Sequence, residues 1–599
     1  MDQKIAAGGA SAGLAPFKDS RRMTISAPTL NKLMVLPALL FMIAIFYYPL
    51  LSVIGVSFNA PDFSLGHYQR FLSSETMLVV LRRTFVYAAA VTAIALVLGY
   101  PLAVFISRMV KQGRTFVLVL VLLPYLTSLL VRTYAWMILL SDHGVINSVL
   151  LSLGLIERPL TLLYTTFGAM VGMVHLVLPI MVLPIYAIVH GMNPEQMRAA
   201  KALGGGPLRS FFAVFLPQTL PGLKAGCILV FAISLGFYIT PAALGGPSDL
   251  LLANIIARLL ETLLDFGYAS AISMILLLAT IAVYVLSGGG LGAVVKGDNQ
   301  GADEGKSRSL GALVGRVGKA LADAEPVVRM QKWLWDRNIG RSAGRGIPFD
   351  YFWYALSIFL LLFLVLPSVI VVVMSFNAGD TLRFPPSALS MRWYETFFSN
   401  KTMMTASLNS IGLATGVALL SLVLGVMAAY ALVRGKLPGT QILYALLLAP
   451  IIVPSIVAAV GTYKVFADWG IVGTSFGVLL AHTPGSLAYV VIILAAIFMG
   501  LDKRLEMASA SLGASRLRTM FRIVIPLVAP GILGATIFAF IHSFDEVVIT
   551  SFIAGIFFYT LPQQIWLTIQ HYTDPMIAAI STLVMILPII ALPFARARR

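Results

Sequence analysis

Long apolar runs alternate with short polar segments along the whole chain. An apolar run needs about 20 residues to cross a bilayer as a helix. Twelve runs reach that length, in two sets of six separated by one long polar segment. The first set lies near 33–57, 79–107, 115–140, 164–190, 223–244 and 271–295, and the second near 353–375, 407–432, 441–466, 474–499, 531–553 and 576–595. The pattern predicts an all-α polytopic membrane protein with about 12 transmembrane helices.

Composition supports this prediction. Hydrophobic residues make up 59% of the chain and charged residues 11%, and the mean hydropathy is +0.91, which excludes an ordinary soluble globular protein. Cys227 is the single cysteine, so an intrachain disulfide and a thiolate metal cluster are excluded. No basic soluble domain accompanies the net charge of +17, so we expect no nucleic-acid partner.

The excess of positive charge predicts the topology instead. Basic residues gather in the two chain ends, in the turns 108–114 and 434–436, and in the polar loops after the fourth run of each set. Lys and Arg accumulate in cytoplasmic loops, so all these segments are predicted to lie in the cytoplasm, both termini included. No small-residue cleavage site follows the run that starts near Leu33, so we interpret that run as a retained span.

Two of the polar loops are copies of one another. The stretch Arg198–Gly222 recurs as Met507–Gly531, and nine positions are identical at a constant separation of 309 residues. They are Ala199/Ala508, Leu203/Leu512, Gly204/Gly513, Leu208/Leu517, Arg209/Arg518, Phe212/Phe521, Pro217/Pro526, Pro221/Pro530 and Gly222/Gly531. Each copy predicts a short helix that ends at Leu-Gly, followed by a second amphipathic stretch. We expect these loops to face another protein.

The repeat extends along both sets of runs. Ser57-Phe58-Asn59-Ala60 recurs as Ser375-Phe376-Asn377-Ala378, and Leu96-Val97-Leu98-Gly99 recurs as Leu422-Val423-Leu424-Gly425. We therefore predict a tandem of two six-span units. The predicted divisions are an N-terminal tail (1–31), a first unit (32–295), a basic linker (296–348) and a second unit (349–599). The linker fits either a basic helix on the membrane surface or a partly disordered tether.

A search for catalytic and cofactor-binding patterns predicts none in this chain. The segment Gly301–Ser307 resembles a nucleotide-binding loop but has three residues between its glycines instead of four. The seven histidines form no clustered metal site. His175 and His482 fall at similar depths in the fourth run of each set, where we interpret them as polar residues that bond between helices.

The duplicated loop resembles the EAA loop of bacterial ABC-importer permeases, which work with a periplasmic binding protein. That pattern has Glu-Ala-Ala, a Gly four residues later and an apolar-Pro pair further on. The copies depart from it at the acidic position, where Arg198 and Met507 stand. The resemblance implies that each loop docks on a cytoplasmic ATPase dimer, which uses ATP and Mg while this chain binds no cofactor. The implied coupling residues are Arg198, Ala199, Ala200, Gly204, Glu506, Ala508 and Gly513.

Further motifs resemble the spermidine/putrescine type of importer. Val131–Trp136 and Phe237–Pro241 look like its first permease subunit, whereas Ser543–Thr550 looks like its second. The resemblance implies a fusion of both subunits in one multi-pass chain of the bacterial inner membrane. It also implies a small cationic solute, of the polyamine class, delivered by a periplasmic solute-binding protein.

Acidic residues within spans are costly and tend to be functional. Asp545 and Glu546 lie in the fifth run of the second set, so they are candidates to counter a cationic solute. Tyr238 occupies the matching region of the first set, and Tyr134 and Trp136 could offer aromatic faces to a cation. The alternatives are a structural hydrogen bond or ion pair for the acids and an interfacial belt for the aromatic residues.

Two other functions fit parts of the sequence. One is the same importer class for another small solute, such as an opine, an amino-acid derivative or an organophosphonate. The other is an ion-coupled secondary transporter built from tandem repeats, which has no need of paired cytoplasmic loops.

Overall fold

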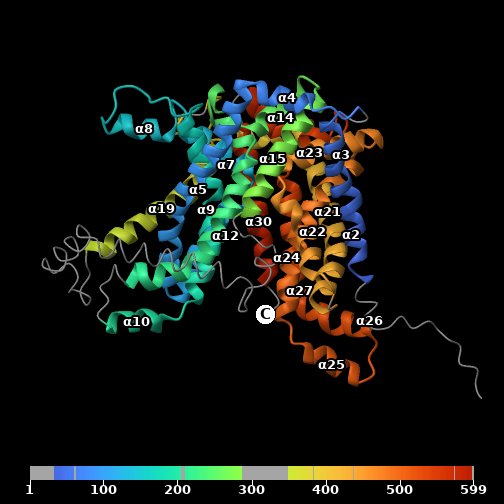
Figure 1. Ribbon diagram of the computed structural model, residues 1–599. Helices are drawn as coiled ribbons and strands as arrows, with labels where there is room; N and C mark the ends of the chain where they lie inside the picture. The colour runs from blue at the N-terminus through green and yellow to red at the C-terminus, as the bar shows by residue number, and fades with distance from the viewer. Residues whose placement is uncertain are drawn as a thin grey trace, which may run out of the picture.

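The structure is a computed structural model that describes residues 33–59, 62–203, 210–286, 348–381, 383–435, 437–571 and 574–596. Long helices run side by side in a bundle, with short helices at both ends (Figure 1). Helices are the main regular structure of the described residues, which also contain one isolated bridge between Asn377 and Leu389. The predicted N-terminal tail and nearly all of the predicted linker lie outside the described residues.

Ten described helices are long and apolar enough to cross a membrane, and one further bent pair qualifies if it counts as a single span. A shorter apolar helix, Met576–Ile586, lies where the twelfth span is predicted. The all-α polytopic prediction is therefore confirmed. The count of ten differs from twelve because the third span of the second set is a bent pair of helices and the twelfth is represented by the shorter apolar helix.

The elements of the first set follow the chain in a simple order. They are α2 (Leu36–Met42), η1 (Ile43–Tyr47), α3 (Tyr48–Ser57), α4 (Gly66–Ser73), α5 (Glu75–Arg108), α6 (Lys111–Leu126), α7 (Leu129–Leu140), α8 (Val145–Ser152), α9 (Thr166–Gly191), α10 (Pro194–Ala202), η2 (Phe211–Phe215), α12 (Leu216–Leu235), α13 (Ile239–Leu244), η3 (Pro247–Asp249), α14 (Leu252–Glu261) and α15 (Phe266–Leu286).

The second set repeats this order. Its elements are α19 (Pro348–Met374), α20 (Arg392–Ser399), α21 (Lys401–Arg434), α22 (Thr440–Ile452), α23 (Ser455–Asp468), α24 (Ser475–Gly500), α25 (Lys503–Ser511), α26 (Arg516–Thr519), η4 (Met520–Val524), α27 (Ile525–Asp545), α28 (Val548–Ile553), α29 (Leu561–His571) and α30 (Met576–Arg596). Helices α5 and α21 both have 34 residues, and α9 and α24 both have 26.

The first helix of each set packs in the apolar core of the other set. Ala38 and Met42 of α2, together with Val35 just before the helix, pack in an apolar core with α21, α22 and α24 of the second set. Leu360 and Leu364 of α19 pack in the corresponding core of the first set, where α19 contacts α5, α6 and α7. The two sets are therefore interlocked, and neither buries its apolar surface without the other.

Proline accounts for the broken third span. Helices α22 and α23 meet at an angle of 97°. Pro450 lies in the last turn of α22, and Pro454 precedes the first residue of α23. Proline lacks the N–H that a continuous helix needs at such a position. In the first set α6 carries Pro124 in the same place and ends two residues later, before α7 begins at Leu129.

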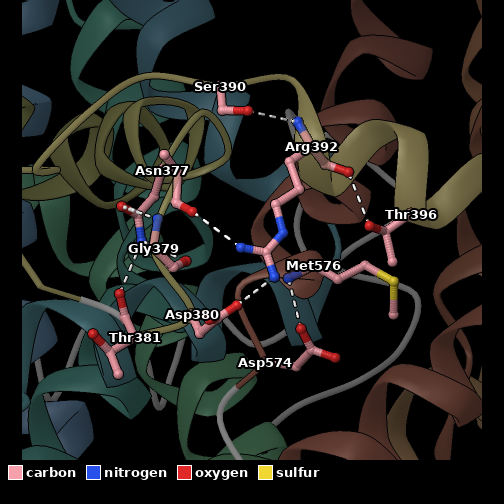
Figure 2. Close-up of polar contacts among 10 residues, drawn as sticks. Asn377, Gly379, Asp380, Thr381, Ser390, Arg392, Thr396, Asp574 and Met576 are labelled. Carbon is pink, nitrogen blue, oxygen red and sulfur yellow. Dashed lines mark hydrogen bonds and ion pairs between the residues drawn. The ribbon is translucent and has the colours of Figure 1, made fainter.

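The two ends of the bundle carry different short elements. Helices α4 and α14 lie at one end, and α10 and α25 lie at the other, below the two flanks of the bundle (Figure 1). At the α4 end, the loop before α20 folds on itself through Asn377, whose amide donates to the Thr381 carbonyl at 2.8 Å. Arg392 pairs with Asp380 in the same loop, near the start of α30, where Asp574 accepts from the Met576 N–H at 2.8 Å (Figure 2). These contacts order the segments that connect the spans.

Candidate functional site

Four broken helices meet between the two sets. Helix α27 ends at Asp545 and faces the break between α6 and α7. Its counterpart α12 ends at Leu235, next to Gly236, which faces the break between α22 and α23. Broken helices inside a membrane bundle free backbone groups for contact with polar partners. These two junctions are therefore the natural place for a polar site in an apolar protein.

Asp545 accepts hydrogen bonds from the start of α7. The Leu129 N–H donates to Oδ1 at 2.9 Å and lies 3.0 Å from Oδ2, and the Ser128 hydroxyl also donates to Oδ1. The first N–H groups of a helix lack partners within the helix and attract negative charge. Asp545 thus caps a helix that lies 416 residues earlier in the chain.

The matching junction of the first set carries no charge. Gly236 stands 309 residues before Asp545, and Pro454 stands 326 residues after Ser128, which are the separations of the repeat. A Cβ at Gly236 would lie 2.9 Å from the Pro454 Cβ, so the two backbones are in close contact. At the first junction a glycine therefore contacts a proline, whereas at the second junction the Asp545 carboxylate contacts the Ser128 hydroxyl.

Glu546 follows Asp545 and is half-buried. Its Oε1 accepts from the Ile549 N–H at 2.9 Å, so it caps α28. The two adjacent acids therefore have different tasks: Asp545 joins the two sets, whereas Glu546 caps the helix that follows it. In the first set Phe237 occupies the position of Glu546.

Arg132 is the basic residue that interacts with the acidic pair Asp545 and Glu546, through Asp545. Its side chain is buried, with the residue 7% exposed, and its Nε donates to the Ser128 carbonyl at 3.4 Å. The guanidinium interacts electrostatically with Asp545, although the two groups form no direct ion pair. Arg132 therefore offsets part of the negative charge, and Glu546 is the acid without a basic neighbour of this kind among the described residues.

Tyr134 and Trp136 belong to the core rather than to an open surface. Tyr134 is fully buried, and its hydroxyl donates to the Asp574 carbonyl at 2.7 Å. The Trp136 ring centre lies 5.6 Å from that of His175 and 5.4 Å from that of Phe363. Their ring faces are covered by protein in this structure, and the expectation that they present faces to a cation stays a prediction.

Tyr238 lies at the boundary between the sets. Its ring meets Trp566 of α29 edge to face, with ring centres 5.7 Å apart. Its carbonyl accepts from the Asn254 amide at 2.8 Å, which ties the start of α13 to α14. Glu261, at the end of α14, is close enough to Tyr238 to interact with it electrostatically.

Helices α10 and α25 contain most of the residues predicted for coupling. Arg198 and Ala199 are exposed on α10, Ala200 is half-buried, and Arg198 pairs with Glu195 at 2.7 Å on the surface. Ala508 is exposed on α25, and Gly513 follows the end of that helix with φ +77°, a left-handed conformation that favours glycine. Gly204 lies outside the described residues.

Glu506 points into the protein rather than outward. Its carboxylate pairs with Arg434 at 2.9 Å and accepts from the Tyr430 hydroxyl at 2.8 Å. The residues most exposed at the ends of the two helices are Leu203 (89%) and Leu512 (88%). Sequence reasoning did not single out these leucines, although their identity in both copies of the loop was the signal that identifies them.

The two histidines bond between helices, as predicted. His175 Nε2 lies 3.1 Å from the Leu364 carbonyl, which links α9 to α19. His482 of α24 contacts the Ser543 hydroxyl at 3.0 Å and the Thr550 hydroxyl at 2.9 Å. Among the described residues no group of three or more His, Cys, Asp or Glu side chains is arranged to hold a metal ion.

A helical bundle with broken spans and acids on one side of its midline has the architecture of a membrane permease. Residues 421–597 match the family described as binding-protein-dependent transport system inner membrane component. The spermidine/putrescine transport system permease protein PotB of Escherichia coli (strain K12) is 33% identical over 238 residues, which cover 38% of this chain and 86% of that protein. The chain belongs to this family, the inner-membrane permeases of ABC importers.

Other relatives match at similar levels. The spermidine/putrescine permease protein PotC of Haemophilus influenzae (strain Rd) is 31% identical over 225 residues, covering 38% of this chain and 87% of that protein. The putrescine permease protein PotI of E. coli (strain K12) is 29% identical over 230 residues, covering 37% and 82%. A solved bacterial alginate ABC transporter in complex with an alginate pentasaccharide-bound periplasmic protein is 17% identical, with a match that covers 45% of this chain and 95% of that chain and has a TM-score of 0.38.

Proposed function

We propose that this chain forms the whole membrane pathway of an ATP-driven importer for a polyamine such as spermidine or putrescine. A periplasmic solute-binding protein delivers the polyamine, and a cytoplasmic ATPase dimer supplies the work through α10 and α25. Asp545 and Glu546 attract the cationic solute at the junction between the two sets. This pair of adjacent acids, in a family whose relatives PotB, PotC and PotI are named for polyamines, is the observation that carries the proposal.

The electrostatics favour an organic cation. A carboxylate within a membrane bundle is costly unless it is paired or hydrogen-bonded. Asp545 is balanced by Ser128, Leu129 and the nearby Arg132, whereas Glu546 interacts with backbone N–H groups at the start of α28 and with no basic side chain among the described residues. An ammonium group that reaches this junction therefore gains a counter-charge at Glu546.

The paired loops favour a two-fold partner. Helices α10 and α25 lie at the same end of the bundle, one below each flank (Figure 1). Each carries a nearly fully exposed leucine at the same position of the repeat, Leu203 and Leu512. The identity and the exposure of these two leucines in both copies of the loop support a contact with another protein at each site. Two equivalent grooves on an ATPase dimer fit this arrangement.

Reconstituted transport tests the proposal. The full chain is placed in proteoliposomes with its ATPase and its binding protein, and uptake of radiolabelled spermidine is measured with ATP inside the vesicles. We expect ATP-dependent and binding-protein-dependent uptake that unlabelled putrescine inhibits. Competition by a neutral amino-acid derivative, an opine or an organophosphonate, without competition by putrescine, would assign another solute. Uptake by the chain alone, driven by an ion gradient, would refute the importer mechanism.

Two groups of variants test the assigned sites. Asp545→Asn combined with Glu546→Gln is expected to weaken uptake of a cation more than uptake of a neutral solute, and equal effects would refute the counter-charge role. Gly204→Asp and Gly513→Asp are expected to uncouple ATP hydrolysis from uptake while the chain still inserts in the membrane. Normal transport in both glycine variants would refute docking through these loops.

A further inference from the structure

A buried ion pair ties one of the two coupling helices to the bundle. Arg434 is the last residue of α21, and Glu506 lies in the first turn of α25. The Arg434 Nε and Glu506 Oε1 atoms are 2.9 Å apart, and the two side chains are 6% and 20% exposed. A charge pair so far removed from water resists rotation and separation, because breaking it leaves a charge without a partner.

Two further hydrogen bonds complete this contact. The Tyr430 hydroxyl donates to Glu506 Oε2 at 2.8 Å, so both carboxylate oxygens are engaged. Arg434 also donates through Nη2 to the carbonyl of Leu501, the residue that follows α24, at 2.7 Å. Arg434 therefore holds α21, α24 and α25 together at one point, which we call the α25 joint (Tyr430, Arg434, Leu501 and Glu506).

The matching place in the first set has no such joint. Arg108 is the last residue of α5, 326 residues before Arg434, but it is exposed and forms no ion pair with a described residue. Met197 stands 309 residues before Glu506 and packs against the apolar core of its set. The ion pair on α10, Arg198 with Glu195, joins two residues of the same exposed helix and holds nothing else.

The α25 joint is connected to the acid at the junction. Helix α21 packs along α24 and along α27. Helix α27 ends at Asp545, which holds the start of α7 in the other set. A displacement of α25 that moves α21 therefore reaches the contact between Asp545 and Leu129 through packed helices.

We infer that Arg434, Glu506 and Tyr430 are positioning residues that make α25 move as one body with α21 and α24, so that the second set couples rigidly to the ATPase while α10 couples through apolar packing. The inference rests on the proposed docking of an ATPase at α10 and α25. It assigns unequal tasks to two coupling helices of equal length, nine residues each. Charge-assisted hydrogen bonds at a fixed geometry transmit displacement, whereas an apolar contact allows the helices to slide.

Coupling stoichiometry tests the inference. The full chain with its ATPase and binding protein is reconstituted, and ATP hydrolysed per spermidine taken up is measured for Arg434→Gln, Glu506→Gln and Arg108→Gln. We expect the ratio to rise roughly 5-fold or more in the first two variants, the lower range of measured coupling effects, and to stay within about 2-fold of the parent in Arg108→Gln. The exchange Arg434→Glu with Glu506→Arg is expected to recover part of the coupling. Parent-like ratios in both single variants would overturn the inference.

A second measurement does not depend on the solute. A spin label is attached at position 511 of α25 in a Ser511→Cys, Cys227→Ser chain, and its mobility is recorded with and without Glu506→Gln or the milder Tyr430→Phe. We expect the label to become more mobile when the joint is broken and to keep its mobility in Arg108→Gln. Unchanged mobility in Glu506→Gln would refute the joint. Failure of the parent complex to take up spermidine would instead refute the proposed function and leave the label result intact.

Discussion

The junctions of the two sets have the same backbone plan and opposite chemistry. In the second set Asp545 receives hydrogen bonds from Ser128 and Leu129. In the first set Gly236 lies directly against Pro454, with no polar side chain at either position. The two sets therefore share the breaks in their helices, whereas a carboxylate stands at the second junction and not at the first.

The end of the bundle that carries α10 and α25 also has its polar contacts in the second set. Arg434 and Glu506 form a buried pair in the second set, and Arg108 and Met197 stand at the matching positions of the first. In the second set, polar contacts thus link α25 to the bundle and Asp545 to α7. The first set contributes the backbone donor of Leu129 to the contact with Asp545, and its helix α10 is held by apolar packing.

The largest expected effect comes from making the two junctions alike. Gly236→Asp introduces a side chain whose Cβ lies 2.9 Å from the Pro454 Cβ. Proline offers no N–H to the new carboxylate, so we expect a loss of about 3 kcal/mol or more and little folded protein. Fluorescence-detected size-exclusion chromatography measures the folded fraction. Gly191→Asp, at the open end of α9, is the control and should accumulate normally.

The next largest effect comes from removing the charge of the second junction. Asp545→Ala leaves the Leu129 N–H and the Ser128 hydroxyl without their acceptor. Hydrogen bonds to a charged group contribute about 1.5–3 kcal/mol, so we expect a loss of about 2 kcal/mol in stability and a larger loss of spermidine uptake. Thermal unfolding in detergent measures the first quantity. Asp468→Asn, in an exposed pair with Lys464, should change neither; a similar loss there would contradict the special role of the junction.

A third prediction concerns the buried acid of the first set. Asp249 is 3% exposed; burial alone would raise its pKa, but hydrogen bonds from Thr166, Tyr87 and the Gly246 N–H lower the pKa below the ordinary 3.8. A lowered folded-state pKa stabilises the fold above the unfolded pKa, and this contribution disappears as the pH falls through the folded value.

Asp249→Asn should therefore lower stability by about 1–2 kcal/mol at neutral pH, the range for a few lost charged hydrogen bonds. The difference from the parent should begin to shrink below about pH 4, where the carboxylate of the unfolded chain becomes protonated, and should disappear as the pH falls through the lower pKa of the folded state. Unfolding scans from neutral to acidic pH measure both. A difference that stays constant with pH would show that Asp249 acts by shape rather than by charge. Phe558 stands at the matching position of the second set, so the effect belongs to one set only.

The smallest expected effect lies in the second coupling loop. Gly513 has φ +77° and open space around a built Cβ, so alanine there meets no atom but adopts an unfavourable backbone conformation. We expect Gly513→Ala to cost about 1 kcal/mol. Gly500→Ala, also in open space but without a left-handed φ, should be neutral or slightly stabilising. Equal melting temperatures of the two variants would contradict the left-handed geometry at Gly513.

Local patterns in the sequence predicted much of this molecule. Spans follow from the length of apolar runs, because each helix satisfies its own backbone in the bilayer. The short helices α10 and α25 follow from polar loops that end in Leu-Gly, and the two acids at 545 and 546 were found by their cost within a span. The sites that involve single elements were therefore accessible before the fold was known.

Contacts between distant elements could not be predicted from the sequence. Nothing local distinguishes Tyr134, a buried core residue, from an aromatic residue that faces a cation. The acid Glu506 was expected at a docking surface, and its pairing with Arg434 depends on how α25 returns beneath α21. The prolines of the third spans were visible, but membrane helices tolerate proline, so the bend of 97° could not be read from Pro450 and Pro454.

The sequence by itself determined that this is a duplicated helical membrane protein with two polar loops and a pair of acids in one span. It did so because hydropathy and repetition are properties of short segments. Only the tertiary structure decided that α2 and α19 exchange places between the sets and that Asp545 caps a helix 416 residues away. These features depend on which apolar faces and unpaired backbone groups meet in space, and many pairings satisfy the same local pattern.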